Sequence, residues 1–402
     1  MRKNLIVGQS GGPSVAINAT LAGVISFAKQ SEKIEKVYGS KNGIEGILNE
    51  TVMDLTDFSE IEKLKVTPAM ALGSCRCKLS NDFSDPMYEK IDAMFKKYNI
   101  GYFLYIGGND SMDTVEKLSR YYLNKEDAPV IVGLPKTIDN DLPITDHTPG
   151  YGSAAKYLAV TMDELIRDVC IYNLKSVTII EIMGRDAGWL TLAAGLPKFL
   201  GGDKPDIIAI PEVAFDEDEF IKEVVKKMET TNNIVVAVSE GIRDKDGNYI
   251  GSSTKSGAVD NFGHAYLSGV AKYLELLVKN KIGCKVRSIE LNLMQRCSSH
   301  LASLSDIEEG FAVGEHGVKM ALNGETGKMV SIERVSDEPY EIKMVSTAIS
   351  ETANKEKNVP LKWRNLENKQ VQKEICNYIL PLIKGNPKKF ENEYGLNDYV
   401  IF

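Results

Sequence analysis

The sequence predicts an α/β protein with two lobes, each built on a mostly parallel sheet flanked by helices, with the active site in the cleft between the lobes. Short apolar runs rich in Val and Ile alternate with segments of helical periodicity along most of the 402 residues, a pattern typical of parallel sheets. Several of the expected strands run into a glycine-rich or polar loop, and ligands of open α/β sheets bind at that edge. The chain is long enough for two such lobes.

Composition narrows the range of partners. The formal net charge of -8 argues against a nucleic-acid-binding surface, which needs a basic face. No segment approaches the roughly 18 consecutive apolar residues of a membrane span, so we expect no membrane partner. The six cysteines show no repeated spacing, and a chain of this length needs no disulfides. We therefore interpret them as reduced thiols in a cytoplasmic protein.

The first expected strand, residues 5–7, leads through a glycine-rich turn containing Gly11 and Gly12 into a helix over 14–29. Such a turn presents backbone N–H groups and the positive end of the helix dipole, which can hold a phosphate. A plain tight turn remains the alternative. After a short strand at 37–38, Arg76 and Lys78 lie in a loop that suits either an anion or solvent.

A strand over 102–106 ends at Gly107-Gly108-Asn109-Asp110-Ser111, before a helix over 112–122. The glycines let a ligand approach the backbone. The polar residues can cap the helix or bind a phosphate-bound metal ion.

The next strand, residues 129–134, ends at Pro135-Lys136-Thr137-Ile138-Asp139-Asn140-Asp141. If this segment is extended, Asp139 and Asp141 point to the same side. One carboxylate could accept a hydroxyl proton while the other holds a metal, which is the division of labour in phosphoryl transfer. An Asp/Asn-rich turn that caps the next helix is the alternative.

The remaining chain continues the alternation. We expect helices at 154–172, 216–230, 261–279, 306–322 and 368–380, strands at 177–182, 207–210, 234–238 and 286–291, and short strands within 327–347. Polar residues again follow the strands, with Arg185 and Glu240 among them. His147, in the loop before the first of these helices, is interpreted as an exposed residue without a catalytic role. The expected units are one lobe at 1–145, a second lobe at 146–325 and a segment at 326–402 that packs back on both.

Taken together, the motifs resemble the phosphofructokinase family over about residues 4–325. They are Gly11-Gly12-Pro13, Gly73-Ser74-Cys75-Arg76, Gly107-Gly108-Asn109-Asp110-Ser111, the segment from Pro135 to Asp141, Met183-Gly184-Arg185, Ser239-Glu240-Gly241, and Arg287 followed by Gln295-Arg296. The resemblance implies a phosphofructokinase-like fold and phosphorylation of fructose 6-phosphate at O1, with Mg²⁺, giving fructose 1,6-bisphosphate. It also implies a homodimer or homotetramer in which Arg287 completes a site across the interface.

The resemblance implies that the lobe at 1–145 binds the donor phosphate and that the lobe at 146–325 binds fructose 6-phosphate. It also implies a role for each matched residue. Asp139 is expected to be the base that accepts the sugar hydroxyl proton, with Asp141 beside it placing metal or charge. Thr137 and Arg185 would contact the transferred phosphoryl group, and the sugar and its phosphate would be bound by Met183, Gly184, Glu240, Arg287 and Arg296. The phosphoryl donor would be bound by Gly11, Gly12, Arg76, Gly108, Asp110 and Lys136.

Three departures from the usual family pattern bear on the donor. Asn109 replaces a metal-associated Asp and Asp110 replaces a Gly, so Asp110 is a candidate for holding a phosphate-bound Mg²⁺. Ser176 stands where ATP-dependent members carry a phosphate-binding Arg, with Lys175 adjacent. Lys136 stands where those members typically have Gly. Asp110 and Lys136 resemble the pyrophosphate-dependent branch, so the expected substrates are pyrophosphate and fructose 6-phosphate. The alternatives are an ATP-dependent phosphofructokinase and a non-catalytic nucleotide-sensing module.

Overall fold

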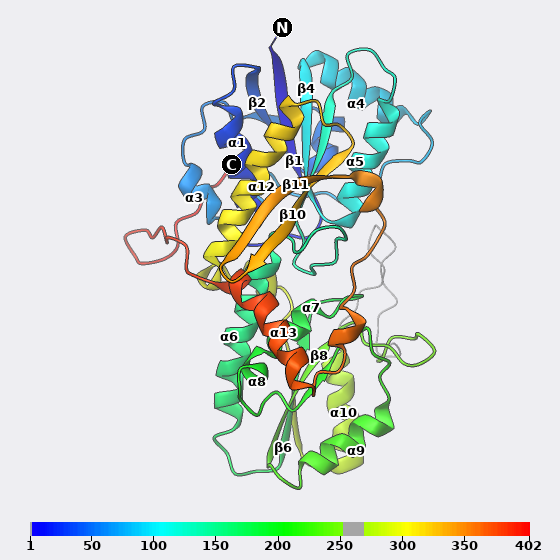
Figure 1. Ribbon diagram of the computed structural model, residues 1–402, viewed down its shortest axis with the longest axis vertical. Coiled ribbons are helices and arrows are strands. Elements are labelled where there is room, and N and C mark those ends of the chain that lie inside the picture. The colour runs from blue at the N-terminus through cyan, green and yellow to red at the C-terminus, as the bar shows by residue number, and fades with distance from the viewer. Residues whose placement is uncertain (1, 252–268) are drawn as a thin grey trace.

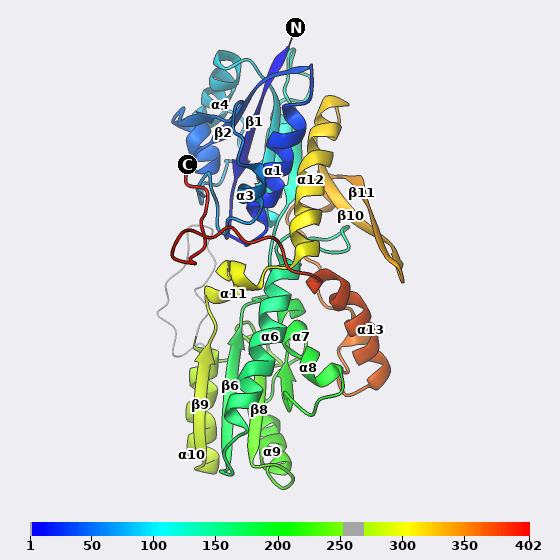
Figure 2. The ribbon, with the colours of Figure 1, turned by 90° about the vertical axis from the view of Figure 1, so that its left-hand side faces the viewer.

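The protein consists of two α/β lobes stacked along its long axis (Figures 1 and 2). The computed structural model describes residues 2–251 and 269–402. Within these residues the strands form two sheets, one in each lobe. The two sheets and their helices confirm the predicted fold class.

The sheet of the first lobe has the strand order β11-β10-β5-β4-β1-β2-β3. Its central strands are parallel, whereas β3 and β11 at the two edges run antiparallel to their neighbours. The strands are β1 (Lys3–Gln9), β2 (Ile34–Ser40), β3 (Val52–Asp54), β4 (Ile100–Gly107), β5 (Val130–Pro135), β10 (Lys328–Asp337) and β11 (Tyr340–Ala348). Because β1, β4 and β5 are parallel neighbours, their carboxyl ends and the three predicted loops meet at one edge.

Helices cover both faces of this sheet. One face packs against α1 (Ile17–Ala28), α3 (Ile61–Lys65) and α12 (Leu304–Leu322), and the other against α2 (Gly43–Leu48), α4 (Pro86–Lys97) and α5 (Asn109–Tyr121). Helix α4 was not predicted from the sequence. Its N-terminus nevertheless has a typical capping sequence, because the Asp85 side chain accepts a hydrogen bond from the Met87 N–H and Pro86 occupies the first helical turn.

The second lobe has a parallel sheet of strand order β7-β8-β6-β9. The strands are β6 (Ser176–Ile182), β7 (Ile207–Ala209), β8 (Asn233–Ser239) and β9 (Lys285–Glu290). One face packs against α6 (Tyr151–Val169), α7 (Trp189–Ala194), α8 (Leu196–Phe199) and α13 (Lys369–Ile379), and the other against α9 (Glu217–Lys227) and α10 (Val270–Ile282). The predicted start of α10 at residue 261 lies outside the described residues.

The chain crosses between the lobes several times after β9 (Figure 2). A short helix α11 (Met294–Cys297) leads to α12, which packs on α1, and β10 and β11 then extend the first sheet. After α13 the tail returns to the first lobe, where the Val400 N–H donates to the Thr67 hydroxyl at 3.1 Å and the ring of Phe402 packs on Phe58. Residues 304–322 therefore belong spatially to the first lobe, whereas the sequence-based division placed them in the second.

His147 differs from its sequence interpretation, because it is buried rather than exposed. Its ring nitrogens lie 2.8 Å from an Asp146 carboxylate oxygen and 2.6 Å from a Glu309 carboxylate oxygen. Glu309 comes from α12, a helix that local sequence cannot place beside residue 147. Burial alone would lower the pKa of His147, but the two carboxylates raise it to about 9.

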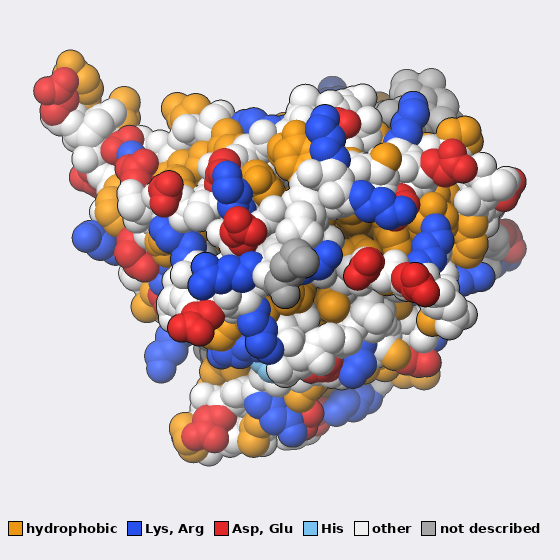
Figure 3. Space-filling model, turned by 90° about the horizontal axis from the view of Figure 1, so that it is seen from above, with side chains coloured by type: hydrophobic (Ala, Val, Ile, Leu, Met, Phe, Trp, Pro, Cys, Tyr) orange, Lys and Arg blue, Asp and Glu red, His pale blue; other side chains and the backbone are white. Residues whose placement is uncertain are grey.

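The surface seen from the N-terminal end carries intermixed acidic and basic side chains (Figure 3). No helix among the described residues is long and apolar enough to cross a membrane.

Candidate active site

A cavity of about 470 Å³ lies where the strand ends of the first lobe face the second lobe, within the size range of small-molecule sites. Thirteen of the fifteen residues expected at the site line it, which leaves out Gly184 and Arg287. They are Gly11, Gly12, Arg76, Gly108, Asp110, Lys136, Thr137, Asp139, Asp141, Met183, Arg185, Glu240 and Arg296.

Buried polar side chains hold the loop after β1 in place. The Gln9 amide donates to the Asn18 side chain at 2.9 Å and accepts the Leu72 N–H at 3.0 Å. The Ser74 hydroxyl donates to the Gly11 carbonyl at 2.8 Å, which ties the loop of Arg76 to the glycine turn. Gly11 has φ 80°, in the left-handed region that favours glycine. Arg76 and Lys78 line the cavity, and both remain exposed to solvent at its rim.

The N-terminus of α5 points its first residues at the same end of the cavity. Gly108 occupies the N-cap position, and Asp110 lies in the first turn, where its charge complements the helix dipole. The Ser111 hydroxyl lines the cavity, is buried and has no hydrogen-bond partner within the described residues. The positive end of the helix dipole and the Ser111 hydroxyl suit an anionic ligand.

Lys136 crosses from the loop after β5 to the glycine turn after β1. Its backbone N–H donates to Gly107 at 2.9 Å, and its ammonium donates to the Gly12 carbonyl at 2.5 Å. The side chain is only 3% exposed, so a solvated surface lysine is ruled out. Burial lowers the pKa of Lys136 to about 8.

Asp139 and Asp141 both face the cavity, but the segment between them is not extended as expected. Asn140 has φ 55°, and its amide donates to the Tyr378 hydroxyl at 2.8 Å, which holds a bend between the two carboxylates. Burial, followed by the charge of Asp141, raises the pKa of Asp139 to about 7. Burial likewise raises the pKa of Asp141. A carboxyl group with this titration suits general base catalysis near neutral pH.

The carboxylate oxygens offer a partial coordination site for a hard cation. Asp141 Oδ1 is buried and accepts no hydrogen bond from the described residues. Among those residues, no group of three or more His, Cys, Asp or Glu side chains could hold a metal ion by itself. Mg²⁺ is commonly held by one or two carboxylates together with substrate phosphates, so this arrangement fits a cation shared with a phosphate ligand.

The second lobe supplies the opposite wall. The Gly184 N–H donates to a Glu240 carboxylate oxygen at 3.2 Å, and the Met183 N–H donates to the Gln295 side chain at 3.0 Å. A Cβ on Gly241 would lie 1.7 Å from the Arg185 carbonyl, so only glycine lets these two loops approach. Gln295, which is 1% exposed, thereby links the position of Met183 to that of Arg296. Burial and the nearby Asp139 raise the pKa of Glu240 to about 8.

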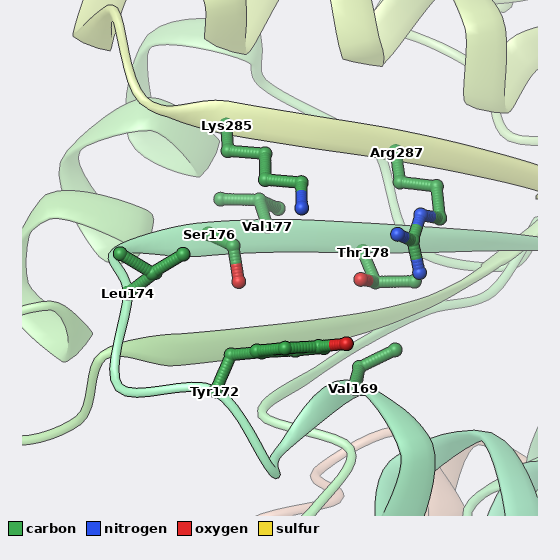
Figure 4. Close-up of a pocket in the computed structure, with 8 residues that line it drawn as sticks. All are labelled: Val169, Tyr172, Leu174, Ser176, Val177, Thr178, Lys285 and Arg287. Atoms are coloured by element: carbon green, nitrogen blue, oxygen red, sulfur yellow. The ribbon is translucent and has the colours of Figure 1, made fainter.

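Arg287 lies away from the cavity, on the edge strand β9. It lines a small groove with Tyr172 and Lys285, and its nearest described carboxylate is Asp168 at 3.9 Å (Figure 4). The Arg287 side chain is 49% exposed. Arg287 therefore does not line the cavity of its own chain.

Sequence reasoning missed three lining residues, Asp186, Asn354 and Glu356. Asp186 follows the predicted Arg185 directly and pairs with Arg243, so its motif gave a usable signal. Asn354 and Glu356 come from a segment without motif or periodicity, and only tertiary packing brings them to the cavity.

Groups for phosphate at one end of the cleft and carboxylates able to accept a proton in its middle define a phosphotransferase that acts on a hydroxyl group. The sequence pattern of the phosphofructokinase family matches residues 4–321, and the chain belongs to this family.

The relatives cover the chain almost completely. A pyrophosphate–fructose 6-phosphate 1-phosphotransferase of Xanthomonas campestris is 42% identical, across 99% of this chain and 95% of its own. The enzyme of the same name from Methylococcus capsulatus is 39% identical over the same shares. Among solved structures, a pyrophosphate-dependent phosphofructokinase from Nitrosospira multiformis superposes with a TM-score of 0.86 at 36% identity, covering 100% of this chain and 96% of that one.

Proposed function

We propose that the protein transfers a phosphoryl group reversibly from pyrophosphate to O1 of fructose 6-phosphate, giving fructose 1,6-bisphosphate, as a step of glycolysis. The observation that carries this proposal is nearly full-length similarity to enzymes named for this reaction, in a chain whose cleft holds Asp110 and Lys136. We further propose that it acts in the cytoplasm, as a homodimer or homotetramer.

In the proposed reaction Asp139 accepts the proton of the sugar O1 hydroxyl as that oxygen attacks the terminal phosphorus. Positioning and charge supply most of the catalysis in such transfers. Thr137 and Arg185, which line the cavity beside Asp139, would contact the moving phosphoryl group. Met183, Gly184 and Glu240 would hold the sugar, and Arg296 its phosphate. The glycine turn, Arg76, Gly108 and Lys136 would hold the phosphate that leaves.

Mg²⁺ is the cofactor that the carboxylates fit. Asp141 would hold it directly, and Asp110 would hold a Mg²⁺ ion that is also bound to the donor phosphates. Its chemistry when bound would be the neutralisation of phosphate charge. Asp141 Oδ1, buried without a hydrogen-bond partner among the described residues, supports this assignment.

Asp110 and Lys136 support pyrophosphate over ATP. A carboxylate at position 110 places negative charge and bulk where the family resemblance puts the third phosphate of a nucleotide. Two like charges about 4 Å apart repel by about 4 kcal/mol at a surface-like effective dielectric, which disfavours the longer donor by orders of magnitude. Lys136 gives the shorter anion a buried cation.

The donor assignment is tested by assaying fructose 6-phosphate turnover with pyrophosphate and with ATP side by side. We expect efficient, reversible turnover with pyrophosphate, little with ATP, and a gain of ATP use in the double variant Asp110→Gly with Lys136→Gly. A wild-type preference for ATP would leave the ATP-dependent enzyme as the better assignment. No turnover with either donor would favour a nucleotide-sensing module, against which the joint presence of Asp139, Asp141 and Arg185 in one cleft argues.

A further inference from the structure

Residues 352–359 cross the mouth of the cleft from one lobe to the other, and we refer to them as the strap. In Figure 1 the strap is the orange stretch that leaves the end of β11 beside α5 and descends to the lower lobe. Asn354 and Glu356 of the strap line the active-site cavity together with Asn109, Asp110 and Ser111 of α5. The strap therefore borders the end of the cavity that the proposed function assigns to the phosphoryl donor.

Asn109 binds the strap with both ends of its side chain. Its amide NH₂ donates to the Lys355 carbonyl at 2.7 Å, and its carbonyl oxygen accepts the Asn354 N–H at 2.6 Å. The side chain of Asn109, the first residue of α5, thus pairs with one donor and one acceptor of the strap backbone. With both ends engaged, the Asn109 side chain is not directed at a ligand.

This pairing gives a physical reason for Asn at position 109. An ionised Asp has only acceptors, so it could keep the Asn354 N–H but would face the Lys355 carbonyl with like partial charge. Only an amide offers the donor and the acceptor that the strap requires. The departure from the usual family motif at this position is therefore explained by the strap.

Further bonds fix the strap along its length. The Asn354 amide donates to Asp113 of α5 at 3.0 Å, and the Lys357 N–H donates to the Asp141 carbonyl at 2.6 Å. On the second lobe, the Trp189 ring N–H donates to the Lys357 carbonyl at 2.8 Å, and the Val359 N–H donates to the Glu212 carboxylate at 2.8 Å. The strap therefore joins both lobes across the cleft.

We infer that the strap, held by Asn109, is a fixed wall that limits the length of the phosphoryl donor to two phosphates. The inference rests on the proposed function, since it assigns the donor end of that site. A longer polyphosphate would have to displace Asn354 or approach the Glu356 carboxylate. Asn109 is a positioning residue in this arrangement, and Asn354 and Glu356 determine specificity.

Inorganic tripolyphosphate is the probe for a longer donor, because it adds one phosphate without a base or sugar. Asn109→Ala removes both bonds to the strap without adding charge. Asn354→Gly removes a side chain from the wall and so enlarges the cavity. The backbone conformation should be retained, because Asn354 has φ 58°, which glycine adopts readily. Asn280→Ala, at an exposed position on α10 in the other lobe, is the matched control. For each variant, hydrogen exchange of residues 352–359 and the ratio of turnover with tripolyphosphate to turnover with pyrophosphate are measured.

We expect Asn109→Ala to accelerate exchange in the strap and both site variants to raise the tripolyphosphate ratio by about tenfold, the effect of roughly one lost hydrogen bond. Asn109→Asp should accelerate exchange as Asn109→Ala does, and Asn280→Ala should change neither readout. Unchanged donor ratios in both site variants would overturn the inference, as would wild-type exchange in Asn109→Ala. If the wild-type protein uses ATP instead of pyrophosphate, the proposed donor fails, while hydrogen exchange still reports separately whether Asn109 holds the strap.

Discussion

Asp139 combines a position at a strand end with an environment that suits the role of base proposed for it. The side chain faces the cleft among Asp141, Arg185 and Lys136. Burial and the charge of Asp141 raise its pKa to about 7, and the two cations oppose this rise. Arg185 and Lys136 lower the pKa of Asp139 and so favour its carboxylate form. In the proposed reaction, Arg185 and Lys136 would therefore both adjust the pKa of the base and contact the phosphate groups.

Replacing Asp139 tests its role directly. Asp139→Asn keeps the size of the side chain but removes the proton acceptor, so kcat should fall by about 10² to 10⁴. Substrate binding should change much less, as read from KM and from isothermal titration with fructose 6-phosphate. Near-normal turnover in the variant would exclude Asp139 as the base.

His147 shows how a buried residue outside the cleft can join segments that are distant in the sequence. Its ring lies between Asp146, which is also bound by Arg334 of β10, and Glu309, which accepts the Tyr340 hydroxyl at 2.6 Å. The loop after β5, α12 and the β10–β11 hairpin thus meet at one buried cation. This network is linked to the bend at Asn140 through Tyr378. The Tyr378 hydroxyl accepts a hydrogen bond from the Asn140 amide and donates one to the Asp146 carbonyl at 2.6 Å.

The raised pKa of His147 predicts a pH-dependent stability. A pKa raised from 6.5 to about 9 means that the protonated ring stabilises the fold fully below about pH 6.5 and that this contribution is lost as the pH rises through 9. The loss amounts to about 3 kcal/mol. Urea unfolding of the wild type at intervals from pH 6 to pH 10, compared with His147→Gln, should show the decline only in the wild type. An NMR titration that places the His147 ring at or below its ordinary pKa would contradict this.

At the scale of elements, α1 is held against α12 by direct backbone contact. A Cβ on Gly23 of α1 would lie 2.1 Å from the Phe311 carbonyl, and one on Gly314 of α12 would lie 2.1 Å from the Thr20 carbonyl. Backbone atoms cannot move aside without shifting the helix. Since α1 follows the glycine turn that lines the cavity, this contact also restrains that turn.

Gly23→Ala should therefore lower the free energy of unfolding by about 3 kcal/mol, the upper range for overpacking. Gly310→Ala on the same helix pair is the control, because its Cβ would lie 3.3 Å from the nearest atom, the Ala16 carbonyl. There the gain in helix propensity of about 1 kcal/mol should offset the tighter contact. Urea unfolding of both variants measures the difference, and equal stabilities would show that the helices can separate without cost.

These elements also show what sequence could and could not predict. Apolar runs predicted the central strands, and the polar residues at their ends predicted most of the cavity lining, because parallel strands bring their carboxyl ends together. The burial of His147 and the pairing of Asn109 with residues 354 and 355 were not predictable, since each depends on segments well over 100 residues away. The bend at Asn140 was missed because its left-handed backbone is stabilised by Tyr378, another distant residue.

At the scale of the whole molecule, β9 has no partner strand on its outer side among the described residues. Strand β9 is an edge strand, and Arg287 on it points to a groove beside Tyr172 rather than to the cavity (Figure 4). Ile171, Tyr172 and Leu174, which precede β6, are all more than half exposed. An open strand edge next to exposed apolar side chains suits contact with a second copy of the chain. We propose that Arg287 reaches the sugar-phosphate site of that copy.

Mixing two inactive variants tests this shared site. Arg287→Ala and Asp139→Asn are each expected to be nearly inactive alone, since one lacks a phosphate ligand and the other lacks the base. In a hybrid dimer with reciprocal sites, both defects fall in one site and the other site has both residues intact. Random exchange of equal amounts should therefore restore about a quarter of wild-type activity, because half of the dimers are hybrids with one working site of two.

Native mass spectrometry establishes that exchange has occurred, and Lys285→Ala, on the same strand, serves as the control that should remain active alone. Confirmed exchange without any return of activity would place the function of Arg287 within its own chain or outside catalysis.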